Sequence, residues 1–181
     1  EIPLRLVGSE MCIRDRYMFE PRDQKTYDVL IKDPMRWLTR QDRLPVGRNE
    51  KELVTIALAR LARSDINVAD SYLRREWAKS MAKSNLAWIR GQYALVAALN
   101  LDSRADDWYH EAGHIRMTDY NAGWKVRAAL RQPKIDWKWV IESIDQMPAA
   151  QQADPSWVYW KARGMAATCL LYTSPSPRDV E

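Results

Sequence analysis

The sharpest chemical pattern in the chain is His110-Glu111-Ala112-Gly113-His114, which fits H-E-x-x-H. On a continuous helix the two histidines would lie on one face, four residues apart, where both imidazoles can bind Zn²⁺. Glu111 would then act as general base. They are the only two histidines in the chain, so a third metal ligand would have to be a carboxylate. Asp119, Glu142 and Asp145 are the candidates, and none of them belongs to a recognisable motif.

A second reading of the same pentapeptide is structural. Gly113 falls where a helix is expected to end, and an imidazolium is stabilised near the C-terminus of a helix by the dipole. The string YHEAGH also resembles the active-site helix of membrane-bound AAA-type zinc proteases. No G-x-x-x-x-G-K-[ST] phosphate loop and no G-x-S-x-G elbow accompany it. Of the three functions that we consider for this chain, a zinc metalloprotease is therefore the least favoured. We predict no metal, no cofactor and no catalytic residue.

Composition excludes several classes of protein. The chain has 181 residues, 28 Lys and Arg against 24 Asp and Glu, and 46% hydrophobic residues. That balance is typical of a globular domain, and a net charge of +4 does not mark a nucleic-acid binder. No apolar run reaches the length of a membrane span. Nine Trp against one Phe is the unusual feature.

Both ends of the chain look foreign to the domain. LVGSEMCIRD at 6–15 and CLLYTSPSPRD at 169–179 resemble translations of the two strands of one sequencing-library transposon adapter. We interpret 1–16 and 169–181 as artefactual adapter-derived segments and 17–168 as the folded domain. Cys12 and Cys169 lie in the excluded segments, so we read them as neither a disulfide nor a metal pair. The natural termini are expected to be missing.

Helical periodicity organises the remaining body. Cap residues followed by apolar positions at spacings of three and four predict seven helices, starting at Asn49, Asp65, Ser84, Ser103, Thr118, Asp136 and Asp154. Every second start is separated by 34 to 36 residues, a spacing typical of stacked helical hairpins. We predict an all-α fold, an irregular α-solenoid or superhelix of antiparallel helix pairs. Ala87, Gly91, Ala94 and Ala98 form a stripe that would let a neighbouring helix approach closely.

The tryptophans are expected to fill this architecture. Large rings suit the gaps between irregularly stacked helices, so most indoles should be buried. Trp137 and Trp139 cannot share one helical face, and a minority of exposed indoles would suit a glycan, because flat ring faces stack on sugars. The sequence does not distinguish the two groups.

From about Trp37 to Ala167 the chain resembles the N-terminal superhelical domain of soluble lytic murein transglycosylases. The resemblance rests on ELVTIALARLARSD at 52–65, WIRGQYALVAAL at 88–99, and above all on residues 123–166. The last stretch carries the family patterns "W…R.AL", "W..V...I..MP" and "D..W.YW.AR..", beginning here at Trp124, Trp137 and Asp154. The family's short "D-W-[YF]-x-x-A-G" helix, which holds no metal ligands, corresponds to 107–113.

The resemblance implies what the parent protein does. Such enzymes cleave the β-1,4 bond between N-acetylmuramic acid and N-acetylglucosamine in peptidoglycan, leaving a 1,6-anhydro end. They are periplasmic and use one glutamate in a C-terminal lysozyme-like domain, whose Glu-Ser motif is absent here. We expect this chain to be the non-catalytic part, with peptidoglycan glycan strands and the missing catalytic domain as partners, and no nucleic acid and no membrane span. A tetratricopeptide-like interaction scaffold is the alternative, since its period fits although its W-x₂-L-G-x₂-Y signature is absent.

Overall fold

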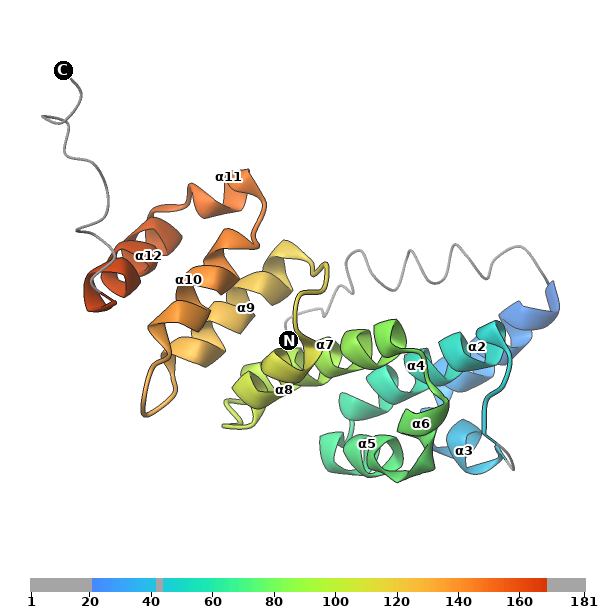
Figure 1. Ribbon diagram of the computed structural model, residues 1–181. Helices are drawn as coiled ribbons and strands as arrows, with labels where there is room; N and C mark the ends of the chain where they lie inside the picture. The colour runs from blue at the N-terminus through green and yellow to red at the C-terminus, as the bar shows by residue number, and fades with distance from the viewer. Residues whose placement is uncertain (1–20, 42–43, 169–181) are drawn as a thin grey trace, which may run out of the picture. The chain divides into compact units, whose positions relative to one another are not determined.

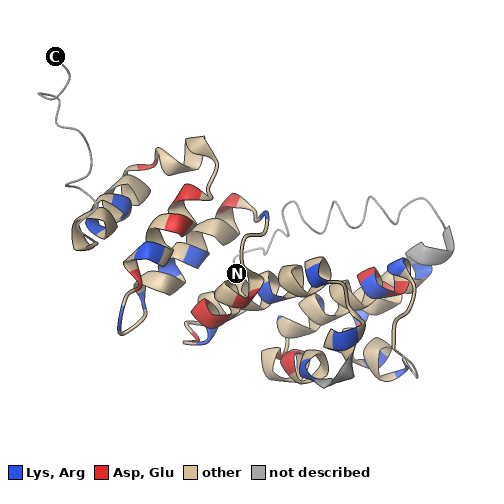
Figure 2. Cartoon of the chain, viewed as in Figure 1, with Lys and Arg blue, Asp and Glu red and all other residues tan. Residues whose placement is uncertain are grey.

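The computed structural model describes residues 21–41 and 44–168, and every regular element in that part of the chain is helical (Figure 1). The all-α prediction is therefore confirmed. The segments at 1–16 and 169–181, and with them Cys12 and Cys169, lie outside the described residues, as do 17–20. None of the described helices is long and apolar enough to cross a membrane. Lys and Arg occur alongside Asp and Glu in both halves of the chain (Figure 2).

The chain divides into two compact units, one up to Thr118 and one from Asp119. The helices of the first are α2 (Pro21–Lys32), α3 (Pro34–Thr39), α4 (Arg48–Ala62), α5 (Ile66–Tyr72), α6 (Ala78–Ser80), α7 (Lys83–Leu99) and α8 (Ala105–Ala112). A π-helical turn, Leu73–Trp77, joins α5 to α6. The second unit contains α9 (Asp119–Leu130), α10 (Trp137–Asp145), α11 (Ala149–Gln152) and α12 (Pro155–Ala167).

In the first unit α4 and α7 are the central helices. α4 packs against α3, α5 and α7, and α7 packs against α8. Their facing residues form an apolar core that includes the fully buried Leu58, Ile89 and Tyr93. Burial of such side chains contributes about 1.5–3 kcal/mol each relative to exposure, so these contacts dominate the stability of the unit.

The second unit has its own core. α10 packs against both α9 and α12, and Val126, Val140 and Ile144 are fully buried between them. Gly164 lets α12 approach α10 closely, because a Cβ at position 164 would lie 2.9 Å from Cγ1 of Ile141 on α10. The side chains of Trp139 and Trp157 are buried in this unit as well.

Helix starts recur with nearly constant spacing. α4, α7, α9 and α12 begin at residues 48, 83, 119 and 155, so successive starts are 35, 36 and 36 residues apart. Each of the first three is followed by a helix that packs on it, namely α5, α8 and α10. The predicted period is thus present in the order and spacing of the helices.

Several predicted caps are confirmed and others are wrong. Asp65, Asp136 and Asp154 accept hydrogen bonds from backbone N–H groups of the first turns of α5, α10 and α12, as expected. α4 instead starts after Gly47, whose N–H and that of Val46 donate to the Glu50 carboxylate. α7 starts after Ala82, α8 follows Arg104, and α11 was not predicted.

Candidate functional site

The helix that carries His110 and Glu111 ends before it reaches His114. α8 stops at Ala112, and Gly113 takes φ 65° and ψ −141°, a backbone conformation that is essentially reserved for glycine. The Gly113 N–H donates to the carbonyls of Tyr109 and His110, which closes the last turn. The two imidazoles therefore do not lie on successive turns of one helix, and the geometry that H-E-x-x-H needs is not formed here.

His110 and Glu111 are engaged in contacts of their own. Nδ1 of His110 lies 2.9 Å from the carbonyl oxygen of Asp106, to which it donates as N–H, and 3.6 Å from the Asp106 carboxylate. Oε2 of Glu111 accepts from Nε of Arg90 at 2.7 Å. Among the described residues no group of three or more His, Cys, Asp or Glu is arranged to hold a metal ion. Glu111, the general base of the zinc hypothesis, instead closes an ion-pair network.

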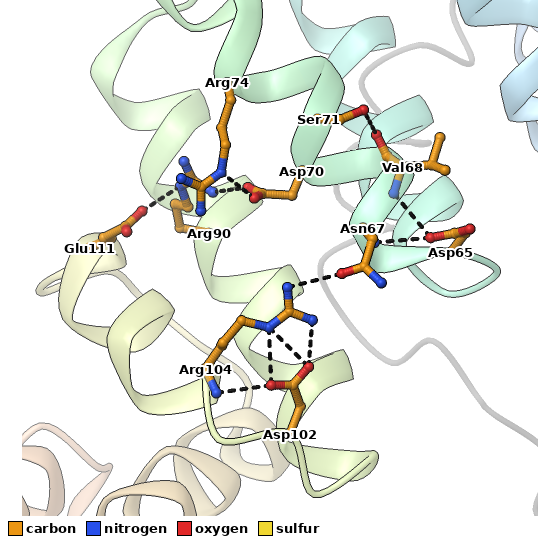
Figure 3. A network of polar contacts seen from close by, with 10 residues as sticks. All are labelled: Asp65, Asn67, Val68, Asp70, Ser71, Arg74, Arg90, Asp102, Arg104 and Glu111. Carbon is orange, nitrogen blue, oxygen red and sulfur yellow. Dashed lines mark hydrogen bonds and ion pairs between the residues drawn. The ribbon is translucent and has the colours of Figure 1, made fainter.

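That network is centred on a buried carboxylate, Asp70 (Figure 3). Its side chain is 8% exposed and accepts from Nη1 of Arg90 at 2.7 Å and from Nε of Arg74. Arg90 in turn reaches Glu111, so the alternating charges connect α5, α7 and α8. The hydrogen bond that Arg74 donates to Asp70 raises the pKa of Arg74 above its ordinary value. Because each buried charge faces an opposite one, the cluster fastens three helices together and offers no free acid or base.

A second ion pair, separate from this network, lies in the loop between α7 and α8. Arg104 donates to both carboxylate oxygens of Asp102, at 2.6 Å through Nη2, and its Nη1 reaches Oδ1 of Asn67 at 2.9 Å (Figure 3). The guanidinium also lies 4.9 Å from the ring centroid of Trp108. These hydrogen bonds lower the pKa of Asp102. A carboxylate with a lowered pKa stays ionised and has no proton to give, so it is unsuited to general acid catalysis at neutral pH.

The indoles divide into two groups. Trp108, Trp139 and Trp157 are buried, and the other six are partly exposed, namely Trp37, Trp77, Trp88, Trp124, Trp137 and Trp160. The prediction that most would be buried is wrong, because only three of the nine are. Helix pairs this short present more ring area than they can cover, so most rings bury one part and leave another in contact with solvent.

One face of α9 combines aromatic and cationic side chains. Tyr120 is 58% exposed and meets Trp124 edge to face, with ring centroids 6.3 Å apart. The Arg127 guanidinium lies 5.3 Å from the centroid of Trp124 and 5.1 Å from that of Trp157 on α12. Spacings of four and three residues place Tyr120, Trp124 and Arg127 on the same face. We call Tyr120, Trp124, Arg127 and Trp157 the aromatic–arginine cluster.

Gly123 makes room for this cluster. A Cβ at that position would lie 3.1 Å from Nη1 of Arg127 and 3.3 Å from Cζ2 of Trp157. Both distances are tighter than ordinary van der Waals contact, so any other residue would displace the guanidinium or the indole. The absence of a side chain at Gly123 thus leaves space for the guanidinium and the indole against α9.

One face of α12 also combines tyrosine, tryptophan and arginine side chains, but its arginine donates a hydrogen bond to the tyrosine. Tyr159 is 51% exposed, and its ring meets that of Trp160 at 5.2 Å. Arg163 lies 5.9 Å from the Tyr159 ring and donates through Nη1 to the Tyr159 hydroxyl at 3.1 Å. This arginine already has an acceptor.

The chain was compared with protein-family models, with curated proteins and with solved structures, and none of them matches.

No site residue was predicted from the sequence. The aromatic–arginine cluster was missed although Trp124 and Arg127 stood within a recognised pattern. The available signal was Tyr-x₃-Trp-x₂-Arg on a helix. The contribution of Trp157, thirty residues beyond Arg127, depends on how α12 packs and is not visible in local spacing.

Proposed function

We propose that this chain is a non-catalytic superhelical portion of a periplasmic peptidoglycan lytic transglycosylase and that it contacts the glycan strands. The observation that carries the proposal is the presence of exposed and partly exposed aromatic rings, Tyr120 and Trp124 on α9 and Tyr159 and Trp160 on α12, on a scaffold of regularly spaced helices. Rings fixed at this level of exposure bury the apolar faces of sugars at a small entropic cost.

The spacing of the helices supports the same proposal. Helix pairs that start every 35 or 36 residues are typical of solenoids, in which each pair packs on its neighbours and successive pairs build an extended binding surface. Cleavage of the glycosidic bond would belong to the lysozyme-like domain of the parent enzyme. The carboxylates of the described polar network are paired with guanidinium groups, which suits a supporting role.

Sedimentation with purified peptidoglycan sacculi tests the proposal. The 181-residue chain should pellet with the sacculi, and the supernatant should contain no 1,6-anhydro-muropeptides after long incubation. A Tyr120→Ala, Trp124→Ala double variant should be retained several-fold less, while Tyr72→Ala, which removes a half-buried ring from the first unit, should be retained normally. Absence of wild-type retention would reject glycan contact and leave the tetratricopeptide-like scaffold as the better reading. Release of anhydro-muropeptides would show that the chain is catalytic.

A further inference from the structure

The Arg127 guanidinium is a cation held in a defined place without an anion. Arg127 is exposed, and its guanidinium lies against the indoles of both Trp124 and Trp157. Within the described residues no carboxylate, carbonyl or hydroxyl pairs with this guanidinium. Contact with aromatic faces leaves the planar fork of N–H donors unsatisfied except by water. Such a fork matches the two oxygens of a carboxylate.

None of the carboxylates in the described part of the second unit pairs with Arg127. Residues 119–168 contain five acidic residues. Asp136 and Asp154 cap α10 and α12, and Asp145 pairs with Lys161 at 2.5 Å. Neither Asp119, in the first turn of α9, nor the exposed Glu142 contacts Arg127. Arg163, by contrast, donates to the hydroxyl of Tyr159. The free fork of Arg127 is thus a particular feature of the aromatic–arginine cluster.

The neighbours of Arg127 define what would bring that carboxylate. Tyr120 and Trp124 offer ring faces and edges along the same side of α9, about two turns and one turn before Arg127. An apolar sugar face on these rings and an acidic substituent on the arginine fork would satisfy both parts at once. Among glycan residues, N-acetylmuramic acid differs from N-acetylglucosamine by a lactyl ether that ends in a carboxyl group.

We propose that the aromatic–arginine cluster binds an N-acetylmuramic acid residue whose lactyl carboxylate is free, with the sugar ring against Tyr120 and Trp124 and the carboxylate on Arg127. This inference rests on the proposed function and names the part of the glycan that is recognised. In peptidoglycan the lactyl carboxyl is blocked as an amide wherever a peptide stem is attached. The site therefore selects glycan from which the stems have been removed, the product of an amide-cleaving reaction.

Binding of the free sugars tests the proposal directly. In NMR titrations of the 181-residue chain, N-acetylmuramic acid should bind about tenfold more tightly than N-acetylglucosamine. A tenfold difference is what charge-assisted hydrogen bonding between one guanidinium and one carboxylate is expected to contribute. The difference should shrink as salt rises. Arg127→Gln should remove it, Arg127→Lys should keep only part of it, and Tyr120→Ala should weaken both sugars equally. Arg163→Gln is the matched control and should leave it intact.

The outcomes separate this inference from the function beneath it. If both sugars bind equally, or if Arg163→Gln abolishes the difference as fully as Arg127→Gln does, the carboxylate site is wrong. Retention on intact sacculi would then still stand by itself. Soluble glycan strands freed of their peptide stems should compete with intact sacculi for the chain better than strands that keep their stems. If they compete no better, selection for bare glycan is refuted. Thermal unfolding of each variant, followed by circular dichroism, checks that lost binding does not reflect lost structure. If Arg127→Gln unfolds the second unit, the Arg127→Lys variant, provided that it folds, serves as the test. If that variant keeps the full tenfold difference between the two sugars, the guanidinium does not recognise the carboxylate through two N–H donors.

Discussion

Two arginines contact the same buried carboxylate, yet they differ in how much each stabilises the fold. Arg90 is 16% exposed and lies between Asp70 and Glu111, whereas Arg74 is 66% exposed and contacts Asp70 from the solvent side. Removing a partner from a buried pair leaves a charge that water does not solvate, while an exposed pair is screened. The environment of each arginine, rather than the number of its ion pairs, sets its contribution.

Truncation of each arginine measures this difference. Arg90→Ala should lower the free energy of unfolding by about 2–4 kcal/mol, because Asp70 loses its buried partner. Arg74→Ala should cost at most about 1 kcal/mol. Urea unfolding of the two variants compares them, and equal losses would show that Asp70 is better solvated than its burial indicates.

Tyr93 gives a second test of an individual side chain. Its ring is fully buried against Trp108, and its hydroxyl has no hydrogen-bond partner among the residues that the structure describes. Burial raises the pKa of this phenol far above its ordinary value, so it remains neutral. An unsatisfied buried hydroxyl costs about 1–3 kcal/mol, and Tyr93→Phe should therefore stabilise the first unit by roughly 1 kcal/mol. A loss of stability in urea unfolding would reveal a partner for the hydroxyl.

At the scale of elements, the sequence predicted helices better than it predicted their ends. Asp136 and Asp154 were correctly identified as caps because an aspartate directly before an apolar helical pattern has one favourable local role. Asn49 and Ser84 suggested starts that lie inside the first turns of α4 and α7, since Glu50 and the extended backbone at Ala82 set those boundaries. The π-helical turn at Leu73–Trp77 carries ordinary helix-forming residues, so periodicity predicted one continuous helix.

The stripe of small residues on α7 also shows what local spacing leaves undetermined. It consists of Ala87, Gly91, Ala94 and Ala98. Spacing identified Gly91 as a point of close approach on α7, and the structure has one there. The approaching group is Ile115, whose Cδ1 would lie 2.7 Å from a Cβ at position 91. Ile115 belongs to the non-helical segment between α8 and α9, not to a helix. A stripe of small side chains indicates that something comes near, but the identity of the neighbour depends on where α8 ends.

The end of α8 is itself a testable property. Gly113→Ala places a side chain at φ 65° and ψ −141° and should cost about 1–3 kcal/mol in the free energy of unfolding. Gly47→Ala is the matched control, because Gly47 precedes α4 at φ −74° with open space around its Cα. Because Gly47 is the N-cap of α4, where alanine is less favourable than glycine, that substitution should cost less than about 1 kcal/mol. Chemical denaturation separates the two, and a neutral Gly113→Ala would mean that α8 can continue toward His114.

The two units of the chain have separate cores, and we expect them to differ in their sensitivity to acid. In the first unit, hydrogen bonds from Arg104 hold the pKa of Asp102 below its ordinary value of 3.8. A carboxylate with a lowered folded pKa stabilises the fold fully above its unfolded pKa, and this contribution is lost as the pH falls through the folded pKa. The first unit therefore carries an acid-sensitive contact joining the loop after α7 to Asn67 on α5.

Acid unfolding of the wild-type chain and of Asp102→Asn measures that contact. The variant should be less stable at pH 7, where the carboxylate is charged and paired with Arg104. The difference should narrow as the pH falls below about 4 and through the lowered pKa that Asp102 has in the folded chain. Asp145→Asn, which removes the half-exposed partner of Lys161 in the second unit, should change the pH profile far less because solvent screens that pair. A stability difference that stayed constant from pH 7 to pH 2 would mean that Asp102 acts through its shape and not through its charge.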